Sequence, residues 1–503
     1  MNVIFRHSFL SICKALVFMF GVSTFQDAGA SATGSLESDS LRYFGEVRAT
    51  FSGGENTPFW LVNNLQGLGS PEKNYGFVRG AVFRDINKDK RFSWGAGIDL
   101  AGAWRSSAPF YIHQLFGEIK YRSLGALVGS KEIWGEFSNP RLSSGNLLYS
   151  GNAMPIPQVR AGIFDYADFW GTNGWFAVKG YIAYGMFTDS GWQKSWTARG
   201  SKRTEDVLYH SKGLWLRGGN TSRFPLTGEI GIEMATQFGG KAFKNGETLE
   251  LGNGFKDWLK AFFPSTTTRK TFLGEQTSVD GNMVGAYNIA LAWIPEADWN
   301  VKAYFQHYFE DHSQMTFEYG WKDGLWGVEA ALPDNPFISS FVYEFLYSKD
   351  QTGAVNNDSS DKVPEQVSGR DNYYNHSIYS GWQHWGMGIG NPLAISPIYN
   401  HNRLLNFFDT RIIAHHVGFS GTPANGIEYR VLLSFSKNWG SYQHPLPEVL
   451  NNFNGLLEVT WKPARLKGWY GSAAIAGDSG KLLGNSFGAM ITIGKAGFIG
   501  TKF

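Results

Sequence analysis

Hydrophobic and polar residues alternate along much of this 503-residue chain, with the period of two that marks a β-strand whose two faces meet different surroundings. Near the start, apolar residues at 92, 94, 96, 98 and 100 alternate with polar or small residues from Arg91 to Asp99. The clearest hairpin runs from Tyr287 to Phe309 around the short turn Pro295–Asp298. This repetition predicts an all-β protein made of antiparallel strands.

A soluble β-sandwich would also alternate, so the turns must distinguish the two architectures. Trp293 and Trp299 flank one short turn, and Trp461 and Trp469 flank another. Tryptophan on both shoulders of a short turn is typical of a ring held at a membrane–water boundary. Phe, Trp and Tyr make up 16% of the chain, which also holds 62 glycines. This composition suits the aromatic girdles and crowded strands of a membrane barrel.

Short turns of such a barrel are expected in the periplasm, and long loops are expected outside. With that polarity, we expect strands near 42–51, 75–84, 91–103, 113–122, 125–131, 157–164, 175–188, 207–217, 226–238, 284–293, 299–309, 325–332, 338–347, 410–419, 428–436, 453–461, 469–476 and 485–493. Every long segment then falls on the outside, and the count is even, as in closed single-chain barrels. The prediction is a transmembrane antiparallel β-barrel of about 18 strands, with long extracellular loops and an internal plug.

Four outer segments are long: 52–73, 132–156, 239–283 and 348–409. The second is rich in turn residues and only modestly charged, so we expect it to fold into the lumen as the plug. The third contains Phe255–Phe263 followed by Pro264, a pattern that predicts a short amphipathic helix within the loop.

The two ends of the chain predict export to a Gram-negative outer membrane. An apolar run from Ala15 to Phe25 precedes Ala28-Gly29-Ala30, which reads as a signal peptide over residues 1–30, with the barrel over 31–503. Cys13, the one cysteine, would leave with that signal, which excludes disulfides and thiolate chemistry from the mature chain. The carboxy-terminal Phe503, after a terminal strand, is the kind of end that the barrel insertion machinery recognises.

Several separate runs resemble a known family. They are Thr57–Leu61, Leu142–Gln158, Tyr304–Asp311, Asp323–Gly327, Tyr343–Tyr347, Lys349–Gln351, Asp371–Asn375 and Gly390–Leu393. In order and spacing, the part of the chain from about residue 43 onward resembles the capsule assembly protein Wzi family, in the form seen in Bacteroidetes-type bacteria.

The resemblance implies an eighteen-stranded outer-membrane barrel that helps hold capsular polysaccharide on the cell surface, as a lectin rather than an enzyme. Its implied partners are that polysaccharide, outer-membrane lipid with its lipopolysaccharide, and the insertion machinery. Some relatives close the periplasmic mouth with a helical region before the barrel. Few residues separate the expected cleavage site from Tyr43, so the segment 132–156 or the loops would have to close this one.

Aromatic and charged residues in two outer loops are candidates for glycan contact, because aromatic faces pack on sugar rings while cations and amides bind uronates and hydroxyls. The candidates in loop 189–206 are Trp192, Lys194, Trp196, Arg199, Lys202 and Arg203, and those in loop 348–409 are Asp371, Tyr373, Tyr374, Trp382 and Trp385. Alternatively, these tryptophans belong to the interfacial belt or to ordinary loop packing, and the cations pair with lipopolysaccharide phosphates.

Inward-facing Lys302, Tyr304, Gln306 and Glu310 are expected to line the lumen, where they would form a rigid hydrogen-bonded wall. If the lumen were open, a barrel of this size could conduct, so the alternative function is a porin or transport channel for saccharides or small solutes.

Catalysis, cofactors and metals find little support in the sequence. No zinc-type spacing is present, and the Asp311-His312 pair has no geometric meaning by itself. His415 and His416 are adjacent on a strand and should point to opposite faces, so they could not share a metal. The formal charge of +2 gives no electrostatic case for nucleic acid as a partner.

Overall fold

The computed structural model of this protein describes residues 40–263, 266–272, 274–310, 315, 321–353, 357–360, 363–368 and 370–500. The chain divides into two units, Met1–Glu37 and Ser38–Phe503, and all described residues belong to the second. The expected signal peptide and Phe503 lie outside the described residues. Among the residues described, no helix is both long enough and apolar enough to cross a bilayer.

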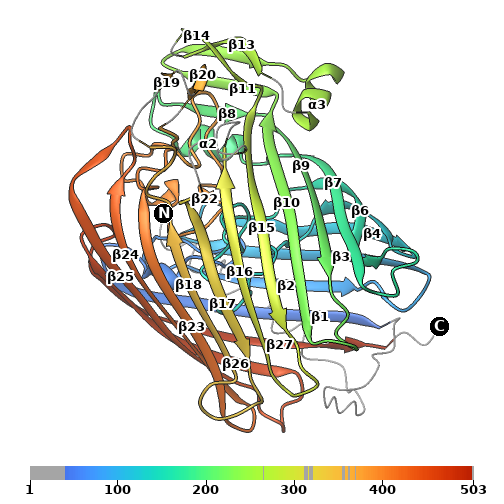
Figure 1. Cartoon of the computed structure of the whole chain (residues 1–503). Helices are drawn as coiled ribbons and strands as arrows, with labels where there is room; N and C mark the ends of the chain where they lie inside the picture. Colours follow the sequence, from blue (N-terminus) through green and yellow to red (C-terminus); the bar gives the residue numbers. More distant parts are fainter. Residues whose placement is uncertain are drawn as a thin grey trace. The chain divides into compact units, whose positions relative to one another are not determined.

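Eighteen antiparallel strands form one closed barrel (Figure 1). In chain order they are β1 (Leu41–Gly54), β2 (Gly76–Arg84), β3 (Phe92–Trp104), β4 (Phe110–Tyr121), β5 (Leu124–Ser130), β6 (Gln158–Asp168), β7 (Phe176–Met186), β9 (Leu208–Gly218), β10 (Leu226–Phe238), β15 (Asn282–Trp293), β16 (Asn300–Phe309), β17 (Gly324–Ala331), β18 (Ser340–Tyr347), β23 (Ile412–Ala424), β24 (Ile427–Gly440), β25 (Pro445–Trp461), β26 (Trp469–Gly480) and β27 (Ser486–Ile499). The predicted strand number and order are confirmed.

The first and last strands close the ring, with Tyr43 opposite Gly497 in the register of β1 and β27. Apolar side chains point outward and polar or small ones inward, as the alternation predicts. On β3, for example, Trp94 and Ile98 are exposed while Asp99 is buried. All connections longer than about ten residues lie at one end of the barrel, which we call the long-loop end, and the opposite end is the short-turn end.

Several strands extend beyond their predicted limits, and β25 and β27 do so by the most residues. β25 begins at Pro445 rather than near 453. β27 runs on to Ile499, past the point near Gly494 where the alternation fails. A Cβ on the inward Gly494 would lie 2.3 Å from the ring of the inward-facing Tyr470, so only glycine fits there. The alternation fails at the next residue, because the charged Lys495 takes an outward position opposite the exposed Trp469.

The segment 131–157, which we call the plug, enters the barrel from β5 and crosses the lumen to the opposite wall. Ser144 donates its N–H and its hydroxyl to Oε2 of Glu344 on β18, at 2.7 and 2.6 Å. Leu147 N donates to the side-chain oxygen of Gln306 on β16, at 3.0 Å. The plug's buried Leu142, Leu147 and Leu148 join the largest hydrophobic core of the barrel. The predicted internal plug is confirmed.

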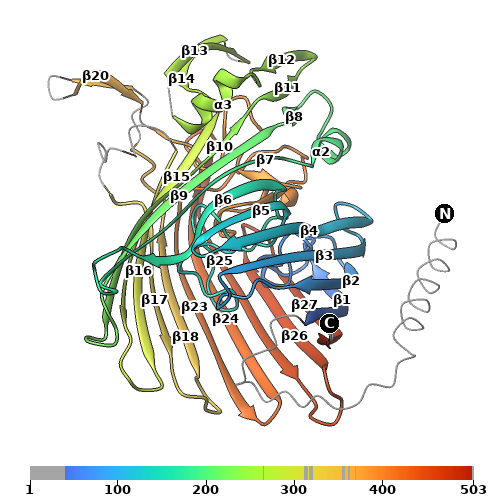
Figure 2. The same ribbon diagram turned by 90° about the vertical axis from the view of Figure 1, so that its right-hand side faces the viewer.

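Smaller elements cap the long-loop end (Figure 2). They are the helices α2 (Ser190–Trp196) and α3 (Phe255–Phe262), the 3₁₀ turn η2 (Pro397–Tyr399), and the strands β8 (Arg203–Glu205), β11 (Gly240–Lys244), β12 (Glu247–Leu251), β13 (Thr266–Thr271), β14 (Gly274–Val279), β19 (Asn357–Ser360), β20 (Val363–Ser368), β21 (Gln383–His384) and β22 (Met387–Gly388). The 3₁₀ turn η1 (Phe59–Leu61) lies inside the barrel, where Trp60 packs on the inward-facing His416 at 5.2 Å. The amphipathic helix predicted near 255–263 is α3, which is confirmed. β8, β11 and β12 form one small sheet, so the loops after β7 and β10 are joined.

Candidate functional site

Helix α2 presents two tryptophans on one face. Trp192 and Trp196 are four residues apart, so their side chains lie one above the other along the helix. Their rings stack with centroids 5.1 Å apart and an interplanar angle of 21°. Trp192 is only 6% exposed, whereas Trp196 is half-buried. Trp192 therefore supports Trp196 from beneath and leaves part of the Trp196 ring open to a ligand.

The loop that carries α2 is fixed to the segment 371–411. Gln193 Nε2 donates to Ser380 Oγ at 3.2 Å, and its side-chain oxygen accepts from Thr204 N at 2.9 Å. Asp189 Oδ2 accepts from Trp385 N at 3.1 Å. Gly386 lies against the Trp192 ring with φ +81°, where a Cβ would come within 2.5 Å of Trp192 Cη2, so only glycine fits. The tryptophan pair is thus held on a rigid base.

Three exposed cations lie on the segments that form this base. Lys194 and Arg199 belong to the α2 loop, and Arg403 belongs to the neighbouring segment. Ala198 N donates to the Arg403 carbonyl at 3.1 Å, which brings the two segments together. Among the ion pairs formed within the described part of the chain, none involves these three side chains. Lys194 and Arg199 lie within three residues of Trp196 in the sequence, and all three cations are exposed and available to an anionic partner.

The other two candidate cations of this loop point into the structure. Lys202 donates to the carbonyl of His376, and its burial, together with the nearby Lys244, lowers its pKa to about 7. The guanidinium of Arg203 pairs with Glu205 and lies 4.0 Å from the centre of the Phe243 ring. These two residues stabilise the loop that presents Trp196.

Most candidates from the long segment 348–409 lie inside the cap. Trp382 is fully buried, and its Nε1 donates to the carbonyl of Leu148 in the plug at 2.8 Å. Tyr373 and Tyr374 are also buried; their hydroxyls donate to Asp323 Oδ2 at 2.9 Å and to the Leu147 carbonyl at 2.6 Å. Asp371 is 9% exposed. Trp385 is half-buried, and its ring lies edge-on to Tyr111 with the centroids 5.8 Å apart. Of the five candidates in this segment, it is the one whose side chain remains partly exposed beside α2.

The four expected lumen residues lie on the inner wall of β16 or at its end, and they contact the plug or its neighbours. Lys302 pairs with Glu329 at 2.7 Å and donates to the Phe137 carbonyl of the plug at 2.9 Å. Tyr304 donates its hydroxyl to Glu344 Oε1 at 2.6 Å, and Gln306 Nε2 donates to Asn288 at 2.6 Å. Glu310 accepts from the Tyr308 hydroxyl at 2.8 Å and from Tyr374 N. These contacts fasten the plug to the wall.

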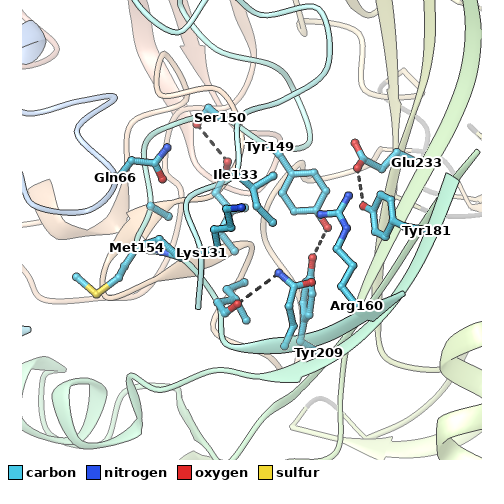
Figure 3. A pocket seen from close by; sticks show the side chains of 15 residues that line it. Gln66, Lys131, Ile133, Tyr149, Ser150, Met154, Arg160, Tyr181, Tyr209 and Glu233 are labelled. Carbon is cyan, nitrogen blue, oxygen red and sulfur yellow. Dashed lines mark hydrogen bonds between the residues drawn. The ribbon is translucent and has the colours of Figure 1, made fainter. Parts of the chain in front are cut away.

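A cavity of about 50 Å³ remains between the plug and the wall (Figure 3). Tyr149 of the plug and Tyr209 of β9 share a 2.6 Å hydrogen bond there, and the Arg160 guanidinium lies 3.4 Å from the centre of the Tyr181 ring. Ligand pockets are usually about 300–1,000 Å³. The cavity is therefore far too small for a sugar residue.

A larger cleft, of about 620 Å³, opens among the outer elements β12, β13 and α3, beside the end of β10. Lys260, Lys270 and Asp257 are among the residues that line it, and Tyr379 lies at its border with the segment 371–411. Lys260 pairs with Asp280 at 2.8 Å across the cleft. This volume falls within the usual range of ligand pockets, about 300–1,000 Å³.

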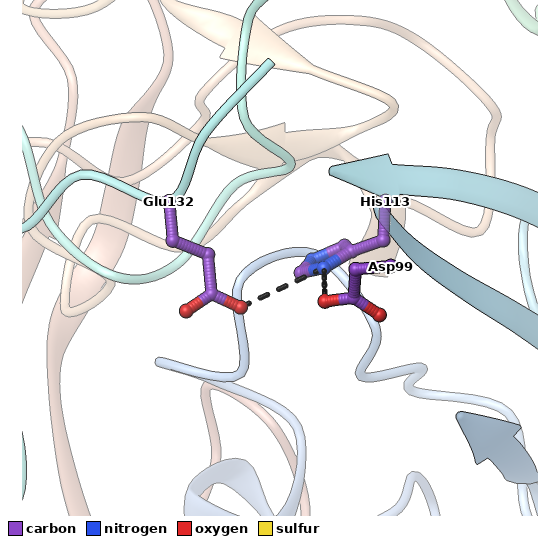
Figure 4. Close-up of side chains that lie close together, drawn as sticks. All are labelled: Asp99, His113 and Glu132. Carbon is purple, nitrogen blue, oxygen red and sulfur yellow. Dashed lines mark hydrogen bonds and ion pairs between the residues drawn. The ribbon is translucent and has the colours of Figure 1, made fainter. Parts of the chain in front are cut away.

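Asp99, His113 and Glu132 lie close enough together inside the barrel to resemble a metal site (Figure 4). However, Arg79 Nη2 already lies among them, 2.5 Å from each carboxylate and 3.1 Å from His113 Nδ1. Nε2–H of His113 donates to the Gln66 carbonyl at 2.9 Å, and Nδ1 lies between Arg79 Nη2 and Asp99 Oδ2, which is 3.2 Å away. The group is an arginine-centred ion network and does not fit a metal ion.

Strict alternation would have placed His113 on the outer face. The register shifts between Asp99 and Leu100, which makes a β-bulge at His113, so that His113 and Gln114 both point inward. Bulges leave no clear mark in a pattern of apolar and polar residues. On β23 the alternation does hold, since His415 is exposed and bonded to Tyr343, whereas His416 is buried against the plug.

Comparison with solved structures identifies similar barrels. Wzi of Escherichia coli, described as an outer-membrane protein involved in group 1 capsule assembly and a carbohydrate-binding β-barrel, matches with a TM-score of 0.55 and 11% identity, over 90% of this chain and 83% of its own. OccK5 (OpdH) of Pseudomonas aeruginosa matches at 0.45 and 9%, over 93% and 100%. OccAB2 of Acinetobacter baumannii matches at 0.45 and 8%, over 92% and 98%. No family model and no curated protein matches the sequence.

These findings define the class of protein. The chain has the fold of an outer-membrane β-barrel, closed by eighteen strands and similar to the fold of Wzi. The plug is bonded to the inner wall, and the long-loop end carries a supported tryptophan and exposed cations that form no ion pair with any described residue.

Proposed function

We propose that this protein binds capsular or other exported polysaccharide at its long-loop end, which faces outward from the cell, and helps attach or assemble that polysaccharide on the surface. The observation that carries the proposal is the stacked pair Trp192 and Trp196 beside Lys194, Arg199 and Arg403. A half-exposed indole packs on the C–H face of a pyranose, and the neighbouring cations bind uronate or other acidic groups. Trp385, which is bonded to Thr188 and Asp189 just before α2, offers a further half-buried aromatic side chain.

The likeness of the fold to a carbohydrate-binding barrel supports this proposal. The stacked tryptophans and the exposed cations offer contacts that would hold a sugar chain. We therefore further propose that the protein acts as a lectin and not as an enzyme. We also propose that a signal peptide directs export of the protein and that the barrel insertion machinery places it in the outer membrane. There it would contact outer-membrane lipid and lipopolysaccharide.

The alternative is a porin-like channel. The plug's bonds to Glu344, Gln306 and His416 argue against it, because they tie the plug to three strands of the opposite wall. The cavity beside Tyr149, of about 50 Å³, is also smaller than the usual ligand pocket.

Deleting the gene and measuring cell-bound against released polysaccharide tests the proposal. Released polysaccharide should rise and the bound fraction should fall. Wild-type protein should restore retention, whereas a variant with alanine at both Trp192 and Trp196 should not restore it despite equal barrel levels in the membrane. Unchanged retention and unaltered capsule architecture after deletion would overturn the proposal.

A further inference from the structure

Helix α3 lies against the outside of the barrel wall. The Trp258 ring packs on Tyr184 of β7 at 4.7 Å and on Phe238 of β10 at 5.6 Å, and the Tyr184 hydroxyl donates to the Trp258 carbonyl at 3.1 Å. Tyr184 faces outward, because it alternates with the buried, inward-facing Ala183 and follows the exposed Ile182 by two residues. The helix therefore covers part of the wall's outer surface and not the lumen.

The carboxy-terminal turn of α3 reaches down the wall along β9. Lys212 donates its ammonium to the Phe262 carbonyl, one of the carbonyls at the helix end that lack an intrahelical partner. The Phe262 ring lies 5.4 Å from His210 and 4.4 Å from the Lys212 ammonium. Lys212 is paired in the sheet with Ile182, so the helix end sits directly beside the apolar outer face of the barrel.

One stripe of α3, continued by Phe263 just after the helix, is apolar and uncovered. Phe255, Leu259 and Phe263 recur every four residues and are 78%, 46% and 65% exposed. Lys256 and Lys260 follow along the next stripe of the helix, Lys256 being exposed. An apolar stripe bordered by lysines is typical of a helix that lies in a membrane interface.

The apolar stripe is continuous with the barrel's lipid-facing surface. Ile182 and Leu214, on the wall beside the helix end, are 45% and 50% exposed and point the same way as Tyr184 and Lys212. From this continuity we propose that α3 is a membrane-interface element. Phe255, Leu259 and Phe263 pack against the acyl chains of the outer leaflet, and Lys256 contacts the headgroup phosphates. We choose lipid as the partner of this stripe for two reasons. The helix lies on the outer face of the barrel wall, and the positive charge of Lys256 matches the negative headgroup phosphates.

Spin labelling of the full chain tests this proposal. Cys13, the only cysteine in the sequence, is replaced by serine, and single cysteines are placed at Leu259 or Phe255, with Lys256→Cys as the matched control on the adjacent polar stripe. Each labelled barrel is reconstituted in vesicles of phosphatidylethanolamine and phosphatidylglycerol. Accessibility is measured to oxygen, which partitions into lipid, and to a nickel chelate, which stays in water.

Labels at 255 and 259 should collide more with oxygen than with nickel, and the label at 256 should show the reverse. The 255 and 259 labels should become nickel-accessible when the barrel is moved into short-chain detergent. Equal nickel accessibility at all three positions in vesicles would overturn the proposal. Protection of position 259 from both reagents would also overturn it, because a second protein copy would then cover the stripe.

Discussion

Ser144 of the plug gives both its backbone N–H and its hydroxyl to a single carboxylate oxygen of Glu344, at 2.7 and 2.6 Å. The other oxygen of Glu344 accepts from Tyr304 at 2.6 Å, so three buried donors converge on one side chain. Hydrogen bonds to a charged acceptor are about twice as strong as neutral ones. Glu344 is thus the main polar link between the plug and the far wall.

Replacing Glu344 with alanine should loosen the plug. Three buried donors would lose their acceptor, each at a cost of about 1–3 kcal/mol. In planar bilayers the wild-type barrel should carry no steady current, and Glu344→Ala should show intermittent openings. The matched control is Glu428→Gln, which alters the half-exposed Arg141 pair at the plug's tip and should stay closed. Steady conductance of the wild-type protein would contradict the plugged lumen and favour the channel reading.

The barrel could be predicted from the sequence because every strand shows the same alternation of apolar and polar residues. The pattern is weak in one strand but convincing over eighteen. Alternation, short turns and even strand parity together predict all eighteen strands. Details that depend on neighbours in space were missed, such as the bulge at His113 and the space that Gly494 leaves for Tyr470. Only some of the residues of the candidate glycan-binding site could be predicted from the sequence. The composition of the α2 loop marked Trp196, but nothing in the sequence distinguished the buried Trp382 from the half-exposed Trp385.

Trp196 should dominate glycan binding by aromatic contact. Trp196→Ala should weaken binding of the cell's own purified polysaccharide by about 0.5–1.5 kcal/mol, roughly two- to tenfold, and Trp196→Phe should retain part of it. Titration calorimetry on the folded barrel measures this difference. Trp170→Ala removes a fully exposed tryptophan at the short-turn end and serves as the control. Equal losses in the Trp196 and Trp170 variants would show that the effect does not arise at α2.

Charge next to Trp196 should set the preference for acidic polysaccharide. Lys194→Gln and Arg199→Gln should each weaken binding by about 0.2–1 kcal/mol and should flatten its dependence on salt, because exposed charges are screened. Binding is measured at low and high salt with an acidic polysaccharide and with a neutral one. Lys88→Gln, which removes an exposed cation paired with Asp165, is the control. If the neutral polymer is affected as strongly as the acidic one, charge is not what these residues contribute.

The Arg79 network should stabilise the barrel more than a surface pair does. Asp99→Asn removes a buried countercharge 2.5 Å from Arg79, at a cost of about 3 kcal/mol. Asp85→Asn breaks an exposed pair with Arg42 and should cost less than about 1 kcal/mol. The temperature at which the folded barrel loses its compact gel mobility compares the two variants. A smaller drop for Asp99→Asn than for Asp85→Asn would contradict this ranking.

The buried Lys202 should make the α2 loop more stable as pH rises. Its pKa is about 7 in the folded loop because burial disfavours the ammonium, against about 10.4 in an unfolded chain. Between these values the open loop binds more protons than the docked one, so raising the pH toward 10 favours docking. Hydrogen exchange of the β8 amides, divided by the intrinsic rate at each pH, should show protection that increases from pH 7 to 10. Lys202→Met should abolish that slope, whereas Lys241→Met on β11, which removes an exposed ammonium paired with Glu250, should leave it intact. A slope that survives in Lys202→Met would place the titrating group elsewhere in the cap.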